Sequence, residues 1–422
     1  MQRVVIAGGG IMGSASAYFL KLRSPDIDVT VLERDPTYVK ASTSLAVGGI
    51  RYQFSNRENI QMCFFAGKFF QEVSQHLAVV PGDKVDINYH QYSYLFLVGD
   101  EGEGSSRSYA TNTVVHENLA VQASCGVPSS FLPVSELKVA CPWMCTDGVS
   151  GGTITPCGSG EGWFDPASLL HAFKKKAISL GVKFIKTDVA GFEGGKKKIS
   201  EVIATDGTRY GCDHVVMACG RHSGVMAEKL GVKKYITVAP RKRYVHMVHC
   251  PAFDVVRSQA FLKGSSPRVR PMPLVVDTSG VYIRPEGDGF LVGWSPLGDD
   301  PDPDADFDDF NVGADVDDVW NNSTWPSLAA RIPAFENAKL KSTWAGHYDY
   351  NTVDHNALIG IIPEGQANVV WATGFSGHGL MQSPAVGRAV SEIVIDGKFK
   401  TIDLTRLSPA RGYSPVWEKN VI

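Results

Sequence analysis

A glycine-rich turn between two short apolar strands constrains the fold of this chain more than any other feature. Residues 3–7 read RVVIA, a β-branched run typical of a buried parallel strand, and Gly8, Gly10 and Gly13 complete a G-x-G-x-x-G pattern. Apolar residues at helical spacing follow, and a second strand is predicted over 28–32, ending at Glu33. This β-α-β unit, with an acid twenty positions after the last glycine, predicts a dinucleotide-binding Rossmann-like domain.

The residue types in this unit suit a ligand that contains a pyrophosphate. Glycine lets the backbone turn tightly and approach the phosphates, and the start of the following helix offers unpaired N–H groups and a partial positive charge. The carboxylate of Glu33 can accept hydrogen bonds from ribose hydroxyls. A glycine-rich turn in an unrelated α/β domain is the alternative, and the spacing of strand, helix and acid argues against it.

The composition excludes several other classes of protein. The 422 residues are 44% hydrophobic and carry a net charge of −3, which is ordinary for a globular chain and unlike a disordered or collagen-like one. Because 41 basic residues nearly balance 44 acidic ones, we expect no nucleic-acid partner. The eight cysteines lack metal-ligand spacing, so we expect reduced thiols and no metal site.

Neither a membrane span nor a targeting segment is expected. No stretch reaches the roughly eighteen apolar residues that a membrane-spanning helix needs. The sequence opens directly with the predicted strand, which leaves no room for a signal peptide. We therefore expect a cytoplasmic protein, or a mitochondrial one if a presequence has been removed.

Later segments extend the nucleotide-binding layer and surround a second one. Strands are predicted over 182–187, 214–218 and 369–372, and a helix over 383–395, while aromatic runs between them predict a mostly antiparallel sheet. The predicted fold class is α/β, α+β overall: a Rossmann-like domain built from discontinuous segments, and an antiparallel-sheet substrate domain. The expected Rossmann-like segments are 1–85, 155–238 and 350–422, and the expected substrate-domain segments are 86–154 and 239–349.

Two charged runs stand out in the second domain. Residues 299–318 contain ten aspartates, whose spacing does not match an EF-hand, so a solvated acidic loop leading into a helix is favoured over a calcium loop. Arg241, Lys242 and Arg243 form a basic run on a predicted strand, where alternation points Lys242 away from the other two. These cations either attract an acidic or bulky substrate or are solvated.

Five short motifs occur in an order that identifies a family. They are GGGIMG at 8–13, the segment 44–51, GWFDP at 162–166, ACG at 218–220 and GFSGHG at 374–379. Over nearly its full length the chain resembles the FAD-dependent amine and amino-acid oxidoreductases, which include D-amino-acid oxidase, glycine oxidase, monomeric sarcosine oxidase and dimethylglycine dehydrogenase. Longer strings at 240–250, 344–360 and 372–390 are similar to one branch, which holds the mitochondrial FAD-dependent oxidoreductase associated with assembly of respiratory complex I.

The resemblance implies FAD extended across the nucleotide domain, with the flavin ring at the interface beneath the antiparallel sheet. It implies oxidation of the C–N bond of an amino acid or an N-substituted or secondary amine, by hydride transfer to flavin N5, giving an imine. The electron acceptor would be O2 or a redox partner. A flavin-containing assembly or scaffold protein with little turnover is the alternative. An NAD(P)-dependent dehydrogenase is disfavoured, because it needs no second flavin segment such as GFSGHG.

The family motifs imply where FAD is contacted along the chain. The segment 374–379, followed by a helix, can offer backbone N–H groups to the flavin C2 carbonyl. Val189 matches a position whose backbone contacts the adenine, and Gly220 belongs to a second FAD-contacting turn. The complete expected set is Gly8, Gly10, Ile11, Met12, Gly13, Glu33, Arg34, Ser42, Ser44, Gly49, Val189, Gly220, Gly374, Gly377, His378, Gly379 and Leu380.

Three catalytic residues are expected beside the flavin. Arg51 matches a family arginine near the ring, where a guanidinium stabilises the negative charge of reduced flavin; the alternative is a surface arginine at a loop end. His378 either touches the flavin or caps its turn. His347 stands where sarcosine oxidase attaches flavin through cysteine, so non-covalent FAD is expected, with attachment through the histidine as the alternative. Otherwise His347 lines the substrate cavity, where it can accept the amine proton.

The carboxylate anchors of sarcosine oxidase are missing from this chain. Phe54 and Met381 stand at the two positions. Arg284 is the expected replacement, because a strand arginine can bind a carboxylate bidentately; a salt bridge at the rim is the alternative. Tyr282, two residues earlier, joins the expected catalytic set. The family's oxygen-activating lysine aligns near Leu291 and is absent, which favours a dehydrogenase or a slow oxidase.

Overall fold

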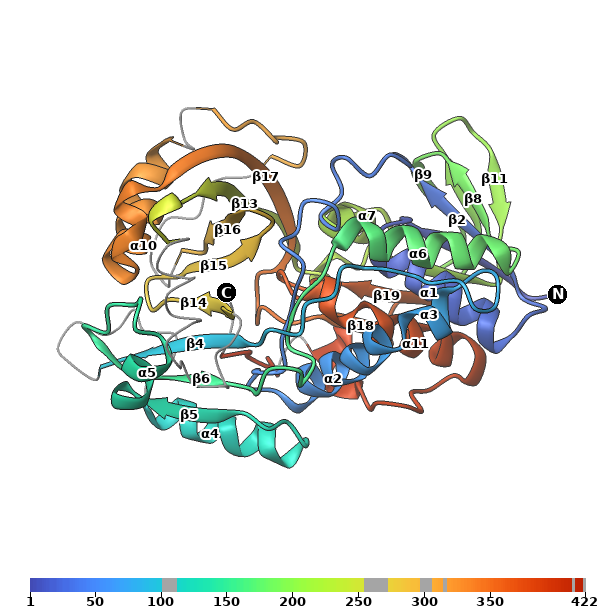
Figure 1. Cartoon of the computed structure of the whole chain (residues 1–422). Coiled ribbons are helices and arrows are strands. Elements are labelled where there is room, and N and C mark those ends of the chain that lie inside the picture. The colour runs from blue at the N-terminus through green and yellow to red at the C-terminus, as the bar shows by residue number, and fades with distance from the viewer. Residues whose placement is uncertain (101–111, 254–271, 297–305, 314–316, 412–413, 420–422) are drawn as a thin grey trace.

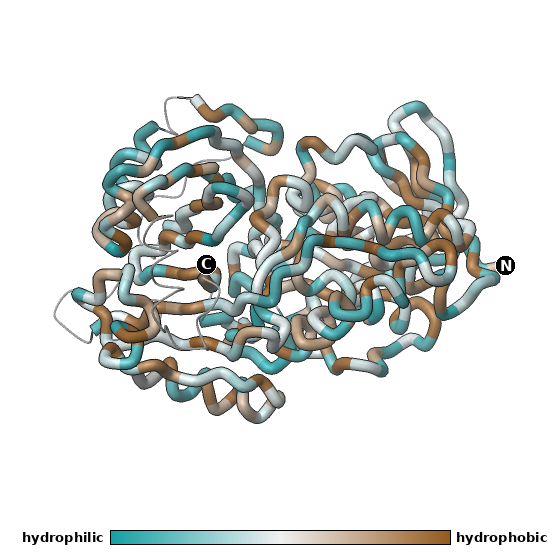
Figure 2. Tube along the Cα trace, viewed as in Figure 1, coloured by the Kyte–Doolittle hydropathy of each residue, from teal (hydrophilic) through white to brown (hydrophobic). Residues whose placement is uncertain are grey.

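The computed structural model places two β-sheet halves side by side, and the chain passes repeatedly between them (Figure 1). Hydrophobic residues recur along the strands of both halves, and hydrophilic residues along the outer loops (Figure 2). The structure describes residues 1–100, 112–253, 272–296, 306–313, 317–411 and 414–419.

The first half is built on a six-stranded sheet with the order β18-β19-β12-β1-β2-β8. All neighbouring strands are parallel except β18 and β19. The predicted β-α-β unit is confirmed, since β1, the first helix and β2 follow one another as expected. The strands are β1 (Arg3–Ala7), β2 (Asp28–Glu33), β8 (Lys183–Lys186), β12 (His214–Met217), β18 (Leu358–Ile361) and β19 (Val369–Thr373).

Alternating residues of this sheet face two different layers. Val4 and Ile6 join the core formed with the long helices, whereas Val5 and Ala7 join the core formed with the opposite layer. Both faces are covered, which explains the nearly continuous apolar strands. The helical layer comprises α1 (Ile11–Arg23), α2 (Arg57–Gln71), α3 (Val73–Leu77), α6 (Pro166–Ser179) and α11 (Gly379–Asp396); the other comprises α7 (Ser223–Lys229), β9 (Val189–Gly195), β10 (Lys198–Ala204) and β11 (Arg209–Gly211).

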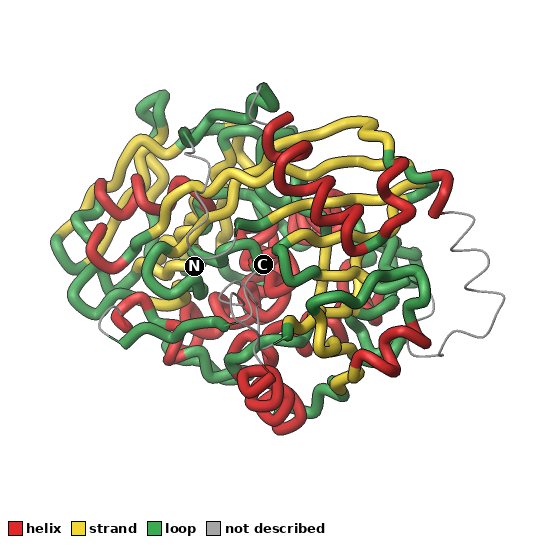
Figure 3. The backbone as a smooth tube through the Cα atoms, turned by 90° about the vertical axis from the view of Figure 1, so that its left-hand side faces the viewer, coloured by secondary structure: helices red, strands yellow, loops and turns green. Residues whose placement is uncertain are grey.

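The second half is an eight-stranded sheet with the order β17-β13-β16-β15-β14-β4-β6-β5. Every pair is antiparallel except β14 with β4, so the predicted mostly antiparallel sheet is confirmed. The turned view shows its long strands with short helices at the margins (Figure 3). The elements are β4 (Tyr94–Gly99), β5 (Ser130–Pro133), β6 (Val149–Ile154), β13 (Val238–His249), β14 (Leu274–Val276), β15 (Val281–Glu286), β16 (Gly289–Trp294), β17 (Lys339–Asn351), α4 (Asn112–Ser124), α5 (Val134–Ala140) and α10 (Trp325–Arg331).

The predicted α/β fold with a second antiparallel sheet is therefore confirmed, and the division into two discontinuous domains stays our proposal. A short two-stranded sheet joins sequence motifs that are far apart: β3 (Gly49–Ile50) pairs with β7 (Gly162–Trp163). This pairing brings the segment before Arg51 against the GWFDP motif.

The last long helix begins earlier than predicted. Helix α11 starts at Gly379 rather than at residue 383, although Pro384 lies inside it. Proline lacks the N–H that would bond to the carbonyl of Leu380, four residues earlier. The hydroxyl of Ser383 donates to that carbonyl instead, over 2.9 Å. This local replacement lets the helix reach the glycine loop.

Candidate functional site

The first glycine turn is shaped by backbone that approaches too closely for a side chain. Gly8 has a φ of +97°, and a Cβ there would lie 2.3 Å from the carbonyl oxygen of Ala218. Gly10 precedes α1, and a Cβ on it would meet nothing nearer than the Thr43 hydroxyl at 3.7 Å. The turn therefore packs tightly against β12 on one side and stays open on the other, where the start of α1 presents its N–H groups.

Glu33, at the end of β2, is held against the same turn. Its carboxylate accepts the N–H of Gly9 over 2.7 Å and that of Asp35 over 2.8 Å. Burial raises the pKa of this carboxyl above its ordinary value. The acid predicted to bind a ribose thus also fixes the glycine turn.

A second helix start faces the same space. The loop 374–379 leads from β19 into α11, and the side-chain carboxylate of Asp349 accepts the N–H of Phe375 over 3.2 Å. Gly377 has a φ of +92°, and a Cβ there would lie 2.8 Å from the ring of Tyr348. Loop, helix start and β17 are therefore packed together by a glycine that leaves room for the tyrosine.

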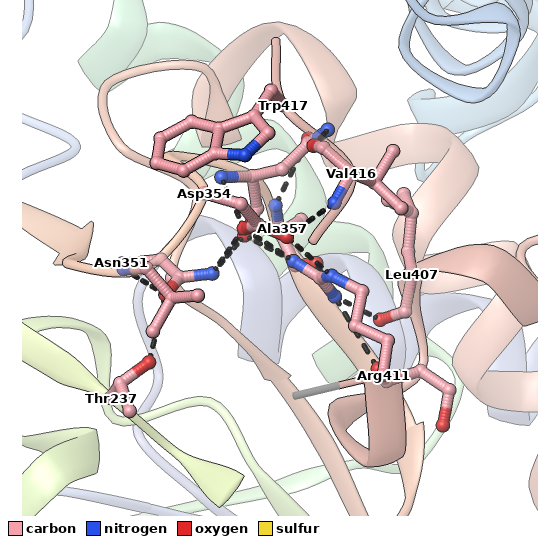
Figure 4. Close-up of polar contacts among 12 residues, drawn as sticks. Thr237, Asn351, Asp354, Ala357, Leu407, Arg411, Val416 and Trp417 are labelled. Carbon is pink, nitrogen blue, oxygen red and sulfur yellow. Dashed lines mark hydrogen bonds and ion pairs between the residues drawn. The ribbon is translucent and has the colours of Figure 1, made fainter. Parts of the chain in front are cut away.

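A polar network beyond this loop fixes its far side (Figure 4). Asn351 donates its backbone N–H to the Ser376 hydroxyl over 3.0 Å and its side-chain amide to Asp354 over 2.7 Å. Asp354 forms a bidentate ion pair with Arg411, whose Nε and Nη2 lie 2.7 and 2.9 Å from the two carboxylate oxygens. The carboxylate also accepts the backbone N–H of Val416. The C-terminal segment is thereby tied to the loop. Because Arg411 and Asp354 are both almost fully buried, this pair depends on its complete set of hydrogen bonds.

Together these elements enclose a cavity of about 900 Å³. Its size is in the range of cofactor sites, and it has helix N-termini at two places along its wall. Among the residues predicted to contact FAD, those lining it are Gly8, Gly10, Ile11, Met12, Glu33, Arg34, Ser42, Val189, Gly220, Gly377, Gly379 and Leu380. Gly49 and His378 line a second cavity, and Gly13, Ser44 and Gly374 line neither of the two.

The second cavity, of about 80 Å³, adjoins the first and shares Ser42, Ala46, Tyr348, Gly377 and Leu380 with its wall. It lies under the eight-stranded sheet. Its polar wall combines two arginines, three tyrosines, two histidines and a serine, and among the described residues that line it none is acidic. The polar members are Ser42, Arg51, Tyr94, Arg243, Tyr282, His347, Tyr348 and His378.

Comparison with known proteins identifies the family of this chain. A family model described as FAD dependent oxidoreductase (DAO) matches residues 3–393. The chain belongs to this family of FAD-dependent oxidoreductases. It is 40% identical to FAD-dependent oxidoreductase domain-containing protein 1 of Xenopus laevis, over 99% of this chain and 84% of that protein.

More distant relatives include proteins named for amine and amino-acid oxidation. The chain is 26% identical to 4-methylaminobutanoate oxidase (formaldehyde-forming) of Paenarthrobacter nicotinovorans, over 94% of this chain and 44% of that protein. The crystal structure of L-proline dehydrogenase from P. horikoshii is similar with a TM-score of 0.77 and 25% identity, over 97% of each chain. The predicted family and FAD dependence are therefore confirmed.

The larger cavity fits FAD by its donor set and its volume. The two helix starts offer N–H groups for a pyrophosphate and for a flavin carbonyl, and the glycines leave room for close approach. Sequence reasoning missed Thr43, Asp349 and Arg221, which also line the cavity. Thr43 and Arg221 lie just outside the short motifs, and Asp349 lies within the string 344–360, which carried no expected role for it, so the fold was needed to reveal them.

Arg51 and His378 meet in the wall of the smaller cavity. Arg51 is 1% exposed; it donates to the Gln53 carbonyl over 2.7 Å, lies 3.2 Å from Nε2 of His378 and stacks on Phe54 at 3.9 Å. Burial and the adjacent guanidinium hold the pKa of His378 well below its ordinary value. The imidazole is therefore neutral, its Nε2 accepts from Arg51, and its proton is assigned to Nδ1.

A buried acid that sequence reasoning missed, Glu161, orders the segment that carries Arg51. Its carboxylate accepts the backbone N–H groups of Tyr52 and Gln53, the Gln53 amide over 2.9 Å and the Thr155 hydroxyl over 2.6 Å. Burial raises the pKa of this carboxyl. The only sequence signal was its place directly before GWFDP.

The structure places Arg284 outside both cavities, in contrast to its expected role. Its guanidinium donates to the Val47 carbonyl over 2.9 Å and pairs with Glu286. Arg243 lies in the smaller cavity instead, 5.6 Å from the ring of Tyr348. Tyr282 does line this cavity, where Gly293 on the neighbouring strand leaves room for its ring. For Arg284, the alternative of a salt bridge therefore agrees better with these contacts than the role of carboxylate anchor.

His347 contributes to the wall of the smaller cavity, but its imidazole packs on Phe310, with ring centroids 4.7 Å apart. His347 on β17 is the register partner of Lys242 on β13. Because side chains alternate along a strand, His347 and Tyr348 lie on opposite faces of the sheet. Burial and the nearby cations Arg221 and Lys242 lower the pKa of His347 to about 4, so it is neutral. The structure thus does not bring this ring to the arginines and tyrosines of the smaller cavity.

Within the described ranges, every helix is too short or too polar to span a membrane. No group of three or more histidine, cysteine or acidic side chains there is arranged to hold a metal ion. Of the acidic stretch 299–318, residues 299–305 and 314–316 lie outside the described part of the chain.

Proposed function

We propose that this protein is an FAD-dependent dehydrogenase or oxidase that oxidises the C–N bond of a small amino acid or N-substituted amine bearing a carboxylate. FAD is held non-covalently in the larger cavity, and the substrate occupies the smaller one. The proposal is supported by relatives named for the oxidation of 4-methylaminobutanoate and of L-proline, both of which combine an amine with a carboxylate.

The observation that carries the proposal is the presence of two guanidinium groups in the wall of the smaller cavity. Arg51 and Arg243 both line it, and among the described residues of that wall none is acidic. An arginine recognises a carboxylate through parallel N–H donors. Leu45, Val47 and Leu274 add an apolar wall, so the cavity suits a small ligand with one anionic end.

Arg243 is our candidate for the carboxylate anchor, replacing Arg284. The hydroxyls of Tyr282 and Tyr348 belong to buried phenols whose pKa values lie above the ordinary value, so both remain neutral donors. They can orient the carboxylate or the amine without adding charge.

The same arginines help to prepare the amine. A substrate ammonium beside two guanidinium groups has a lowered pKa, because a neighbouring like charge disfavours the charged form. The neutral amine is the form that can lose hydride from its adjacent carbon. Bound FAD supplies the hydride acceptor, and Arg51 stabilises negative charge that builds on the reduced flavin.

The test begins with the visible spectrum of the purified protein before and after acid precipitation. Flavin that moves to the supernatant supports non-covalent FAD. Anaerobic mixing with sarcosine, proline, glycine and 4-methylaminobutanoate, each beside its carboxamide, should bleach the flavin for at least one acid and not for its amide. Oxygen uptake compared with reduction of an artificial dye then distinguishes oxidase from dehydrogenase.

If dithionite reduces the bound flavin but none of these amines does, the proposal is contradicted. A scaffold protein that retains a flavin would then be favoured. Colour that stays in the pellet would contradict non-covalent binding and make His347 the first residue to replace.

A further inference from the structure

Part of the acidic stretch lies across the wall of the FAD cavity. Four consecutive residues, Phe307 to Phe310, each contact a residue of the nucleotide-binding half or of the strands β13 and β17. A solvated acidic loop was the expectation, so these contacts need an explanation.

The first two residues of this run meet the cavity wall beside Glu33. The ring of Phe307 stacks on His222, 5.2 Å between centroids and inclined by 20°, and its carbonyl accepts the Nε–H of Arg221 over 2.8 Å. Asp308 lies 3.5 Å from Arg34 and 3.6 Å from Arg221. Arg34, Arg221, His222 and Asp308 all line the FAD cavity.

The next two residues fasten the run to the other half of the molecule. Asp309 pairs with Lys242 over 2.7 Å, and Lys242 also donates to the carbonyl of Asn311 over 2.8 Å. Lys242 is 2% exposed, so this is a buried cation whose charge depends on these partners. Phe310 packs on His347 and lies 5.0 Å from the guanidinium of Arg221.

We propose that residues 307–310 form a clasp that closes the FAD cavity at its Glu33 end and must open for FAD to enter or leave. The clasp bridges the two halves, since Phe307 and Asp308 hold the nucleotide side while Asp309 holds β13. Lys242 therefore serves to anchor the clasp and not to bind substrate, which accounts for its direction opposite to Arg243. The inference rests on FAD use, which the family shows, and not on the choice of substrate.

A clasp that opens predicts a particular kinetic signature. Because the contacts of the clasp are all with protein groups, weakening them speeds both uptake and release of FAD. The ratio of the two rates, which is Kd, then changes little. A side chain that simply bound FAD would instead change release and Kd together.

The experiment measures both rates by flavin fluorescence, using holoprotein diluted into excess competing apoprotein for release and apoprotein mixed with FAD for uptake. The variants are Asp309→Asn and the double variant Phe307→Ala with Phe310→Ala. We expect each to raise both rates by about tenfold or more, with Kd within about twofold of wild type. Glu193→Gln removes a carboxylate from an exposed ion pair with Arg209 and serves as the matched control, with no change expected.

Salt gives a second measurement on folded wild-type protein. Asp308 is 66% exposed, so its ion pairs weaken as ionic strength rises; both rates should therefore increase with salt, and Asp308→Asn should show less of this increase. Unchanged rates in the Asp309 and phenylalanine variants would overturn the clasp, as would a higher Kd with unchanged uptake. Holoprotein that no amine reduces would contradict the proposed function alone, because release and uptake of FAD remain measurable.

Discussion

Replacement of Glu161 tests whether a buried carboxylate positions Arg51 in the wall of the smaller cavity. Glu161 is fully buried and accepts four hydrogen bonds, two of them from the backbone directly after Arg51. Glu161→Ala leaves the N–H groups of Tyr52 and Gln53 without this acceptor. Each unsatisfied buried N–H costs about 1–3 kcal/mol, so the free energy of unfolding should fall by about 2–6 kcal/mol.

The conservative variant separates hydrogen bonding from charge. In Glu161→Gln the remaining amide oxygen can still accept both backbone N–H groups. The new amide nitrogen faces the Gln53 amide, which is also a donor, so one hydrogen bond is lost. Hydrogen bonds to charged groups contribute about 1.5–3 kcal/mol. The loss of stability should therefore be about 2 kcal/mol, smaller than that of the alanine variant.

Urea unfolding followed by tryptophan fluorescence measures the stabilities, and anaerobic flavin reduction measures the effect on Arg51. We expect the amine to reduce the flavin more slowly in both variants, because Arg51 is less well placed. The rate should fall further in Glu161→Ala than in Glu161→Gln. Glu364→Gln, which removes an exposed carboxylate paired with Lys234, should change stability by less than about 0.5 kcal/mol. An alanine variant within about 1 kcal/mol of wild type would refute the reasoning, as would a glutamine variant with the larger loss.

Three further predictions concern the two cavities. Arg243→Gln should raise KM for the reducing amino acid by about tenfold or more while changing kcat less, whereas Arg284→Lys, outside the cavity, should leave KM unchanged in the same steady-state assay. Gly8→Ala should yield protein without flavin in the visible spectrum, because its Cβ would press on a backbone carbonyl at 2.3 Å. Burial raises the pKa of Asp349 to about 6, so the folded state holds a proton that the unfolded chain releases, and this stabilisation is lost as pH rises from about 4 to about 6. The melting temperature of Asp349→Asn should therefore exceed that of wild type by more at pH 8 than at pH 5. An equal difference at the two pH values would contradict this prediction.

Sequence periodicity predicted the strands and helix around the first glycine turn. It could not predict which arginine side chains point into the smaller cavity. Alternation correctly separated Lys242 from Arg243, because it is a property of one strand. It could not tell which of Arg243 and Arg284 reaches the cavity. That choice depends on Val47, more than two hundred residues away in the chain, whose carbonyl holds Arg284. Glu161 and the clasp escaped prediction for the same reason, since their partners lie on other elements.

The order of strands explains why separate glycine motifs line one cavity. Strand β12 lies between β1 and β19, and all three are parallel, so their carboxyl ends meet at one edge. The G-x-G-x-x-G turn follows β1, Gly220 follows β12 and the loop 374–379 follows β19. Each motif could be predicted singly as a strand followed by a turn. Their meeting required the sheet order, which brings the starts of α1 and α11 into the wall of the same cavity, where their N–H groups suit the anionic part of an extended ligand.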